Sequence, residues 1–504
     1  MAQKSKQWGA IIVMIALFAM IAFVTNLCTP MATIIKNQGE ISNALAQIGN
    51  IGNFIAYLVM GIPAGMLIAK YGYKKTALIG LVIGIVGILI QWCSGLIDAG
   101  DGSNIGVVFG VYLLGAFIAG LTMCILNCVV NPMLNLLGGG GNKGNQLIQV
   151  GGVFNSSAAV ACYILMGALI ADASKAKIAD ATPALWIALA IFAIAFVVIL
   201  FTKIDEPEQA PVDFSLVKGA LKFRHFALGA LAIFLYMGVE VGTPNAVQQY
   251  LNTDKQEVLD KKSAIVKDFE NGKIDAANAA LALTAVTTNI EEVRASGKED
   301  DIKKLYKDLA GTEKKLANKE ITSEKYENSF AGLGIPAGTV GMIVAVYWFM
   351  MLIGRFTGAA IGSKVSSRAM VTTVATITLA LVLFGMYAPM DVLVNFPGVD
   401  WGKLELIWQP IPIGIFAFLL VGLCTSVMWG AIFNMAVEGL GKYTAVASGI
   451  FMTMVFGCAV MMPLQGWVAD LFGWIPSFWV VFACAAYILF YALIGSRVSK
   501  TAAE

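Results

Sequence analysis

The chain alternates between long apolar runs and short polar segments along most of its length. Twelve of the runs reach the length of about 20 residues that a helix needs to cross a membrane. We expect spans at residues 8–30, 44–69, 76–98, 106–137, 146–171, 182–202, 225–250, 337–362, 369–389, 411–437, 445–470 and 474–496. The pattern therefore predicts an all-α integral membrane protein with twelve transmembrane helices.

Basic residues are unevenly distributed over the segments between these spans. With the N-terminus inside, the cytoplasmic segments hold Lys4, Lys6, Lys70, Lys74, Lys75, Lys143, Lys203, Lys218, Lys222, Arg224, Lys364, Arg368, Lys442, Arg497 and Lys500, whereas the short outer loops hold only Lys36, Lys175, Lys177 and Lys403. Lysine and arginine favour the cytoplasmic side. We therefore expect a multi-pass protein of the bacterial inner (plasma) membrane with both termini in the cytoplasm.

Composition supports this class and argues against several others. Hydrophobic residues make up 58% and charged residues 13% of the 504 residues, against about 45–50% and 25% in soluble proteins. A net charge of +2 implies no nucleic-acid partner. The eight cysteines lie in apolar runs without zinc-site spacing, and the single histidine, His225, has no partner for catalysis. We expect no metal, no cofactor and no enzymatic activity.

One hydrophilic segment, residues 251–333, holds about 30 of the 66 charged residues. Its apolar positions recur at helical spacing, as in Val258, Ile265 and Phe269. We expect an extracytoplasmic helical insert between the seventh and eighth spans. It is either a solvated spacer or helical hairpin without activity of its own, or it acts as a lid or as a docking surface for a protein partner.

Two pairs of short sequences indicate an internal repeat. Thr29-Pro30 and Thr243-Pro244 are 214 residues apart, and the segments 131–138 and 434–441 are 303 apart. The offset grows by about the length of the insert, which indicates two related halves. The predicted domains are an N-terminal six-helix bundle, 1–203, a cytoplasmic linker, 204–224, and a C-terminal bundle, 225–504, that carries the insert.

Several stretches within the spans are similar to those of one transporter family. They are Gly61–Gly65, Asn131–Pro132, Phe154–Ser156, Tyr236–Glu240, Tyr347–Trp348, Gly354–Gly358, Glu438–Gly441 and Pro463–Asp470. On these residues the chain resembles the sugar:cation symporter family of the major facilitator superfamily, the fucose and glucose/galactose permeases. Tyr347–Trp348 and Glu240 are more similar to the glucose/galactose branch. The insert has no counterpart in the family pattern.

The resemblance implies the major facilitator fold and import of a neutral monosaccharide, a hexose such as glucose, galactose or fucose, coupled to a proton or sodium ion. Two positions depart from the family. Thr29 stands where the family has an aspartate, and Asn127 stands where the fucose branch has a glutamate. The change at Thr29 keeps a sugar uniporter among the alternatives.

Glu240 is the clearest ionisable residue inside a predicted span, in the register opposite Asn26 of the first half. Charges in membrane helices are costly and mark functional sites. Burial favours a neutral carboxyl group, so Glu240 is able to gain and lose a proton during transport. We expect it to couple cation movement or to bind sugar; the alternative is a structural ion pair. Arg355 is expected to snorkel or to bond between helices.

The candidate sugar ligands are carboxamides, which donate and accept hydrogen bonds as sugar hydroxyls do. Asn26, Asn127, Asn155 and Gln465 are predicted to bind substrate, although bonds between helices would also explain buried amides. Trp348 lies in mid-span and is predicted to stack on the sugar ring. The tryptophans near outer span ends are expected to anchor the protein in the membrane interface, namely Trp401, Trp408, Trp467 and Trp474.

Two further hypotheses stay open. One is a major facilitator carrier for another small solute, such as a nucleoside, an organic anion or a drug. The other is a sugar sensor without transport activity that uses the outer insert. The sequence does not name the sugar, the coupling ion or the oligomeric state.

Overall fold

The computed structural model describes residues 8–27, 43–97, 104–138, 141–169, 178–202, 215–295, 297, 299–361, 365–400, 405–440 and 443–498. Thr29, Trp401 and the first part of the predicted linker, residues 204–214, lie outside the described residues. So do several basic residues used for the orientation, namely Lys4, Lys6, Lys36, Lys175, Lys177, Lys203, Lys364, Lys403, Lys442 and Lys500.

The first half of the chain is helical. Its elements are α1 (Trp8–Asn26), α3 (Asn43–Leu96), α4 (Ile105–Leu137), α5 (Gly141–Leu169), the 3-10 turn η1 (Ile178–Ala181) and α6 (Thr182–Phe201). Helix α3 contains one non-helical residue, Gly72, with φ 79° and ψ 173°. Glycine tolerates this conformation because it has no Cβ. The residue divides α3 into two helices, which correspond to the predicted spans 44–69 and 76–98.

The second half begins with α7 (Ser215–Leu221), α8 (Arg224–Glu240) and α9 (Gly242–Asn252). Beyond residue 335 it continues with α15 (Ala337–Ile361), α16 (Ser367–Tyr387), α17 (Ile413–Val437), α18 (Thr444–Thr453), η3 (Met454–Phe456), α19 (Gly457–Phe472), α20 (Trp474–Phe490) and η4 (Tyr491–Gly495). The predicted spans 225–250 and 445–470 are therefore not single regular helices. In the first, the one residue between α8 and α9, Val241, keeps helical φ and ψ of −98° and −33°, so the irregularity is local; the second passes through the 3-10 turn η3.

Within the described residues, eleven helical segments are long and apolar enough to cross a membrane, and Phe54–Ile68 is a shorter apolar helix. The prediction of a membrane-spanning fold built from helices is confirmed. Helices suit the hydrocarbon region because they satisfy every backbone hydrogen bond within one segment.

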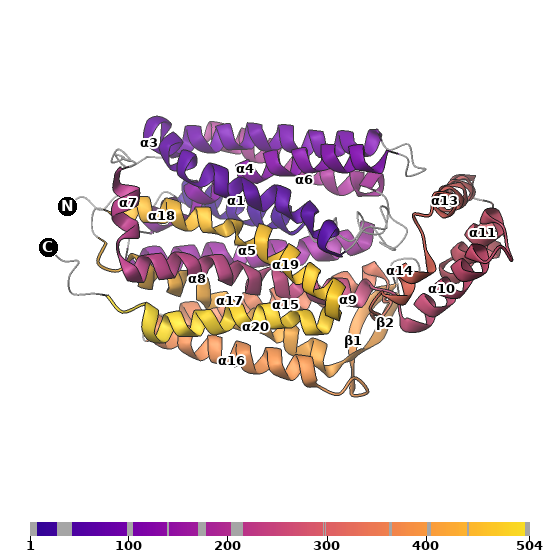
Figure 1. Cartoon of the computed structure of the whole chain (residues 1–504). Helices are drawn as coiled ribbons and strands as arrows, with labels where there is room; N and C mark the ends of the chain where they lie inside the picture. Colours follow the sequence, from indigo (N-terminus) through magenta and orange to yellow (C-terminus); the bar gives the residue numbers. More distant parts are fainter. Residues whose placement is uncertain are drawn as a thin grey trace.

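Helices of the first half lie on one side of the molecule, and most helices of the second half lie on the other (Figure 1). The two sets meet where α5 packs against α15 and where α3 packs against α19. Glycine allows the closest approaches. A Cβ on Gly87 of α3 would lie 2.5 Å from the Ala119 nitrogen, and a Cβ on Gly115 of α4 would lie 2.6 Å from the Gln91 nitrogen. Small residues permit such helix contacts in membranes.

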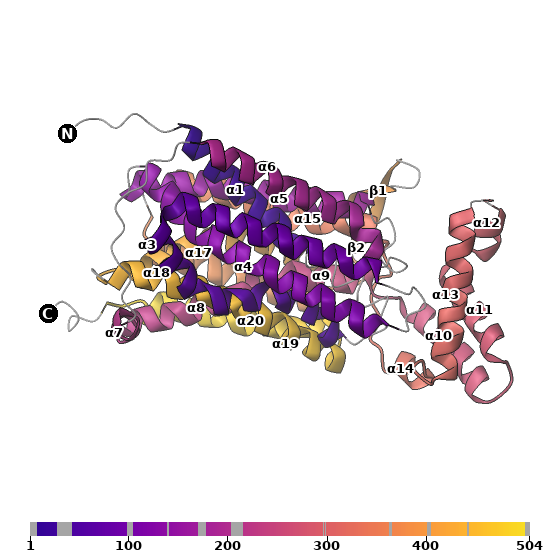
Figure 2. The ribbon, with the colours of Figure 1, turned by 90° about the horizontal axis from the view of Figure 1, so that it is seen from above.

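The charged segment forms short helices beyond one end of the bundle (Figures 1 and 2). They are α10 (Gln256–Glu270), α11 (Ala276–Thr287), α12 (Ile290–Ala295), α13 (Glu299–Ala317) and α14 (Ser323–Glu327). They have a small core of their own, built on Val266, Leu283 and Leu316, with Ile265 and Phe269 packed against it. The helical periodicity predicted for this segment is confirmed.

A β-hairpin between α16 and α17 was not predicted. Strand β1 (Leu393–Asp400) pairs antiparallel with β2 (Glu405–Pro412), at the same end of the molecule as α10–α13 (Figure 1). One face of the hairpin packs inward through Phe396, whose ring lies 5.8 Å from that of Phe416. The other face is exposed, with Leu406 and Trp408 at 77% and 68%.

The tryptophan predictions have mixed outcomes. Trp408 and Trp467 are exposed, as an interfacial position requires. Trp474 is buried at the start of α20, and its expected place at the lipid interface is wrong. A hydrophobic run does not reveal which side of a helix faces its neighbours when the whole run is apolar.

Candidate functional site

Glu240 is the last residue of α8, at the point where the seventh apolar segment is interrupted. Pro244 has no N–H, so the helical hydrogen bond that residue 244 would donate to the Glu240 carbonyl cannot form. The helix resumes at Gly242 as α9. Transporters commonly place solute and ion sites at such discontinuous helices. This irregularity marks the surroundings of Glu240 as a candidate site.

Arg355 of α15 lies beside Glu240. Its Nη2 is 4.0 Å from Glu240 Oε1, and the two side chains are 12% and 14% exposed. At this distance the charges attract without a direct hydrogen bond. Arg355 Nη1 instead donates to Asn155 Oδ1 at 3.2 Å and to the Gly152 carbonyl, both on α5. One guanidinium therefore connects a carboxylate of the second half with two acceptors of the first half.

Asn155 uses both ends of its carboxamide. Its Oδ1 accepts from Arg355, and its Nδ2 donates to the Phe18 carbonyl of α1 at 2.9 Å. The side chain thereby ties together α1, α5 and α15. The expected bond of Arg355 between helices is confirmed, and the contact places it directly at a predicted site.

Hydroxyl groups occupy the next positions around Glu240. Tyr236, one helical turn earlier on α8, donates to the Thr425 carbonyl of α17 at 3.2 Å. The Tyr347 hydroxyl of α15 lies 3.1 Å from Thr425 Oγ1. The ring of Trp429, also on α17, lies 6.0 Å from the Tyr236 ring. These contacts fix α8, α15 and α17 relative to one another.

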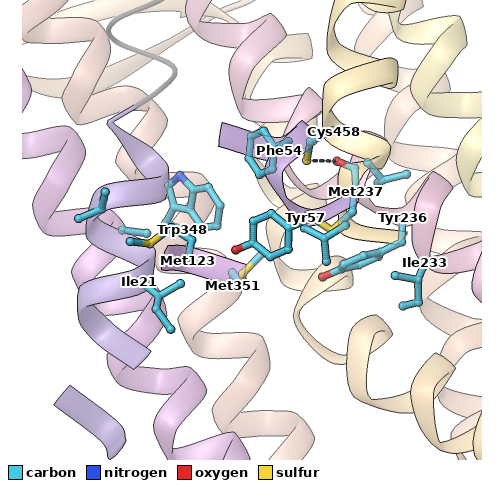
Figure 3. Close-up of a cluster of buried hydrophobic side chains, with 14 of the residues drawn as sticks. Ile21, Phe54, Tyr57, Met123, Ile233, Tyr236, Met237, Trp348, Met351 and Cys458 are labelled. Carbon is cyan, nitrogen blue, oxygen red and sulfur yellow. Dashed lines mark hydrogen bonds between the residues drawn. The ribbon is translucent and has the colours of Figure 1, made fainter. Parts of the chain in front are cut away.

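Beside this network, buried side chains of both halves gather in one cluster (Figure 3). Tyr57 of α3 belongs to it, and its hydroxyl accepts a hydrogen bond of 2.9 Å from Asn127 Nδ2 of α4. Trp348 belongs to the same cluster. The cluster members labelled in Figure 3 are Ile21, Phe54, Tyr57, Met123, Ile233, Tyr236, Met237, Trp348, Met351 and Cys458.

Trp348 packs against the first half of the chain. Its ring stacks on Tyr163 of α5 at 6.2 Å between centroids and meets Tyr347 edge-on at 5.4 Å. The residue is 5% exposed, and its Nε1 has no hydrogen-bond partner among the described residues. In this arrangement the ring offers no open face, so stacking on a sugar would require Tyr163 to move.

Gln465 and Asn26 differ in their relation to Glu240. The Gln465 Oε1 of α19 lies 2.9 Å from the place of a Cβ on Gly242, so its side chain reaches the broken helix. Its Nε2 is buried and has no partner within the described part of the chain. Asn26 donates to the Ala22 carbonyl of its own helix at 2.7 Å. The described contacts do not connect Asn26 to the Glu240 network.

The structure thus joins Asn155 and Glu240 through Arg355 and brings Gln465 to the next turn of the chain. It places Asn127 and Trp348 at the neighbouring cluster. The hydroxyls of Tyr57, Tyr236 and Tyr347 were not predicted as site groups, although Tyr236 and Tyr347 lie in the quoted stretches. The charges of Glu240 and Arg355 cancel, and the remaining groups are neutral donors and acceptors. Such a set suits a neutral, hydroxyl-bearing solute.

The described residues contain no group of three His, Cys, Asp or Glu side chains placed to hold a metal ion. The cysteines that the structure describes, from Cys93 to Cys484, are free thiols.

Comparison with known proteins agrees with this architecture. A glucose/galactose transporter of Brucella abortus biovar 1 (strain 9-941) is 24% identical over 98% of this chain and 96% of its own. The L-fucose-proton symporter of Escherichia coli (strain K12) is 20% identical over 96% and 92%, respectively. The crystal structure of the Escherichia coli fucose:proton symporter covers 97% of this chain and 100% of its own, with a TM-score of 0.59 and 19% identity. The last similarity shows a shared fold.

These relatives are transporters, which agrees with the expectation that the protein is not an enzyme. The family model described as Major Facilitator Superfamily matches residues 11–267, about half of the chain. The chain belongs to the Major Facilitator Superfamily.

Proposed function

We propose that the protein imports a neutral monosaccharide by cation-coupled symport and alternating access. Twelve transmembrane helices would form two bundles, residues 1–203 and 225–504, joined by a linker at 204–224, with Phe54–Ile68 as the core of the second span. The similarity to a glucose/galactose transporter and to an L-fucose-proton symporter supports a hexose as the solute.

We also infer that the protein lies in the bacterial inner membrane with both termini in the cytoplasm. Helix α7 and the end of η4 lie at one end of the molecule, and α10–α13 lie at the other (Figure 1). With the basic loops inside, the insert 251–333 faces outward. This orientation agrees with the positive-inside distribution of lysine and arginine.

The observation that carries the proposal is the Glu240–Arg355–Asn155 network. It contains charges that are only 12% and 14% exposed, it joins the two halves, and it lies one helical turn before Pro244. A neutral sugar fits because the arginine charge is already matched by Glu240. An organic anion would need an unmatched cation, and Arg355 does not supply one.

The same network suggests how a cation is coupled to movement. A charged Glu240 competes with Asn155 and Gly152 for Arg355, whereas a protonated Glu240 leaves Arg355 to those two acceptors. Hydrogen bonds to charged groups contribute about 1.5–3 kcal/mol. A change of that size shifts a two-state equilibrium by roughly 10–100-fold. Protonation would thus favour the state in which α5 and α15 are joined.

We propose sugar binding by Asn127, Asn155, Glu240, Gln465 and Trp348, with Asn26 at the edge of the site. Glu240 is the coupling residue. Carboxamides and the carboxyl group would hold the hydroxyls, and Trp348 would cover the ring once Tyr163 moves. Since Thr29 stands where the family has an aspartate, a sugar uniporter is the second arrangement that the experiment must separate.

The test uses proteoliposomes with labelled hexoses, with and without proton or sodium gradients. Wild type should concentrate one hexose when the correct gradient is imposed. Glu240→Gln should exchange sugar across the membrane but fail to concentrate it. The control is Glu405→Gln, which changes an exposed carboxylate on β2. Concentration by Glu240→Gln at the wild-type level would end the coupling assignment, and indifference of wild type to both gradients would establish a uniporter.

The insert provides a test against the sensor hypothesis. The Gly332 nitrogen donates to the Asp254 carbonyl at 2.7 Å, so the ends of the insert already meet. Residues 255–331 can therefore be replaced by a short glycine link. Uptake that survives this deletion supports a transporter, whereas a protein that never takes up sugar but loses a sugar-dependent signal would support a sensor.

A further inference from the structure

Helix α9 carries an unusual row of carboxamides. Asn245 is followed three and four residues later by Gln248 and Gln249, and Asn252 comes four and three residues after these, so the four side chains share one face. Three of them are buried, at 0%, 5% and 1% exposed for Asn245, Gln248 and Gln249. We call these four residues the amide row. Hydrogen bonds between helices would explain such amides only where their polar atoms find partners on neighbouring helices.

The amide row is incompletely hydrogen-bonded. Both polar side-chain atoms of Asn245, both of Asn252 and Oε1 of Gln248 are buried without a partner among the described residues. A buried amide atom loses its hydration and gains nothing unless another group bonds it. Native proteins leave few such atoms unsatisfied. Several on one helix face indicate that a group other than the described residues bonds them.

Polar atoms on neighbouring helices are in the same condition. Gln465 of α19 reaches the first residue of α9, and its Nε2 is buried without a described partner. Trp474 begins α20, which packs against α9, and its Nε1 is also unsatisfied. Helix α9 contains no charged residue. The surroundings therefore offer neutral donors and acceptors.

The position of the row is defined by its two ends. Asn245 lies five residues beyond Glu240, and Asn252 twelve, which corresponds to roughly 7 and 18 Å along a helix. At the far end, the Ile335 nitrogen donates to the Leu251 carbonyl at 2.8 Å, where the chain returns from the insert. The row thus extends from the Glu240 site to the root of the insert.

We propose that the amide row is a second, outer binding site for a neutral polyhydroxylated solute, which it holds before the solute reaches Glu240. Each carboxamide donates and accepts, as each sugar hydroxyl does. The absence of charge on α9 selects against ionic solutes. This inference rests on the proposed sugar import and adds a site in series with that of Glu240.

The experiment replaces Asn245 and Gln248 by apolar residues of similar size, Asn245→Leu with Gln248→Met. We expect the half-saturating hexose concentration for uptake to rise at least tenfold. The maximal uptake rate should stay within about twofold of wild type, because Glu240 and its contacts are unchanged. Asn252→Leu alone, at the outer end of the row, should raise the half-saturating hexose concentration about threefold. Gln256→Met, an exposed amide on α10, should change neither value.

Folding is monitored in the same samples by thermal unfolding, with and without D-glucose or D-galactose. Removing unsatisfied amides should leave the melting temperature of the sugar-free protein unchanged or higher. Unchanged half-saturation in both variants would overturn the outer site and leave the proposed function standing. An experimental map at saturating sugar that contains only water at Asn245 would also overturn it.

The two proposals fail in different ways. Wild type that neither takes up a hexose nor is stabilised by one contradicts both. Wild type that is stabilised by a hexose without uptake contradicts import alone. In that case, loss of the stabilisation in the double variant, with retention in Glu240→Gln, would still support the outer site.

Discussion

Replacing Arg355 by glutamine is the most direct perturbation of the candidate site. The change keeps the side chain polar and removes its charge. It leaves Glu240 without a counter-ion and removes the charged donor that Asn155 Oδ1 accepts from. The lost counter-ion affects Glu240 in the second half of the chain, whereas the lost donor affects Asn155 in the first half. A variant of either partner residue can therefore test each loss by itself.

The expected magnitude follows from the distance. Two unit charges 4.0 Å apart interact by about 4 kcal/mol at an effective dielectric constant of 20. Removing one partner of a buried pair costs about 3–5 kcal/mol, because the other charge stays buried and uncompensated. Arg355→Gln should therefore destabilise the protein by about 3–4 kcal/mol. Glu240→Gln with Arg355→Gln should cost less than the sum of the single changes, by about 2–3 kcal/mol.

The measurement is a double-mutant cycle on the full chain by equilibrium unfolding in mixed detergent micelles, with sugar exchange in proteoliposomes as the functional readout. Glu405→Gln combined with Arg355→Gln serves as the control cycle and should be additive within about 0.5 kcal/mol. The reasoning is refuted if Glu240 and Arg355 are additive as well. Additivity would mean that their proximity carries no energy.

Three further predictions concern other parts of the molecule. A Cβ on Gly61 would lie 3.0 Å from a backbone nitrogen of α18, whereas a Cβ on Gly65 would meet nothing within 4 Å. Gly61→Ala should therefore lower the free energy of unfolding by about 1–3 kcal/mol and slow sugar exchange, while Gly65→Ala serves as the control. Equal melting temperatures of these two variants would contradict the prediction. In the insert, Lys267 bonds Glu327 at 2.5 Å and lowers the pKa of that carboxyl, while Glu327 raises the pKa of Lys267. The stabilising contribution of the pair should be full between pH about 4.3 and 10.4, decline as the pH falls through the folded pKa of Glu327, and decline as it rises through that of Lys267. Hydrogen exchange of α10 in the whole protein measures this, and an acid limb that persists in Glu327→Gln would count against it. Trp408 should be quenched by brominated lipid in a single-tryptophan variant, since its exposed hairpin face adjoins the predicted outer interface; full access to aqueous iodide would place it in water instead.

The fold was predictable because the membrane imposes a strict length on its helices. Runs of about 20 apolar residues leave little choice in lipid, where only helices and closed barrels satisfy the backbone. The β-hairpin was not found because Pro397 and Gly398 weaken a strand pattern and its inward face is set by Phe416 on another element. The burial of Trp474 was missed for a related reason. An apolar helix carries no sign of which face meets protein.

The site was predictable where chemistry alone marks a residue. A carboxylate within an apolar run, as at Glu240, is rare enough to indicate function. Asn155 was found as an amide near mid-span, but its partner Arg355 was expected only to bond between helices. Sequence separation explains this, since Arg355 and Asn155 are 200 positions apart. Nothing in the local sequence of either helix specifies that contact.

Pro244 links the two proposed sites in one piece of backbone. It ends the regular helix beside Glu240, and the amide row starts at the residue that follows it. A continuous helix would hold Glu240 and Asn245 in fixed register, so a rearrangement of Arg355 would have to move the whole span. The hydrogen bond that Pro244 cannot donate leaves a point where α8 can bend in response to the charge of Glu240 while α9 stays packed against α15, α17, α19 and α20. Coupling and solute capture can then be separated within a single span, and Asn245→Leu should alter half-saturation without altering the dependence on the ion gradient.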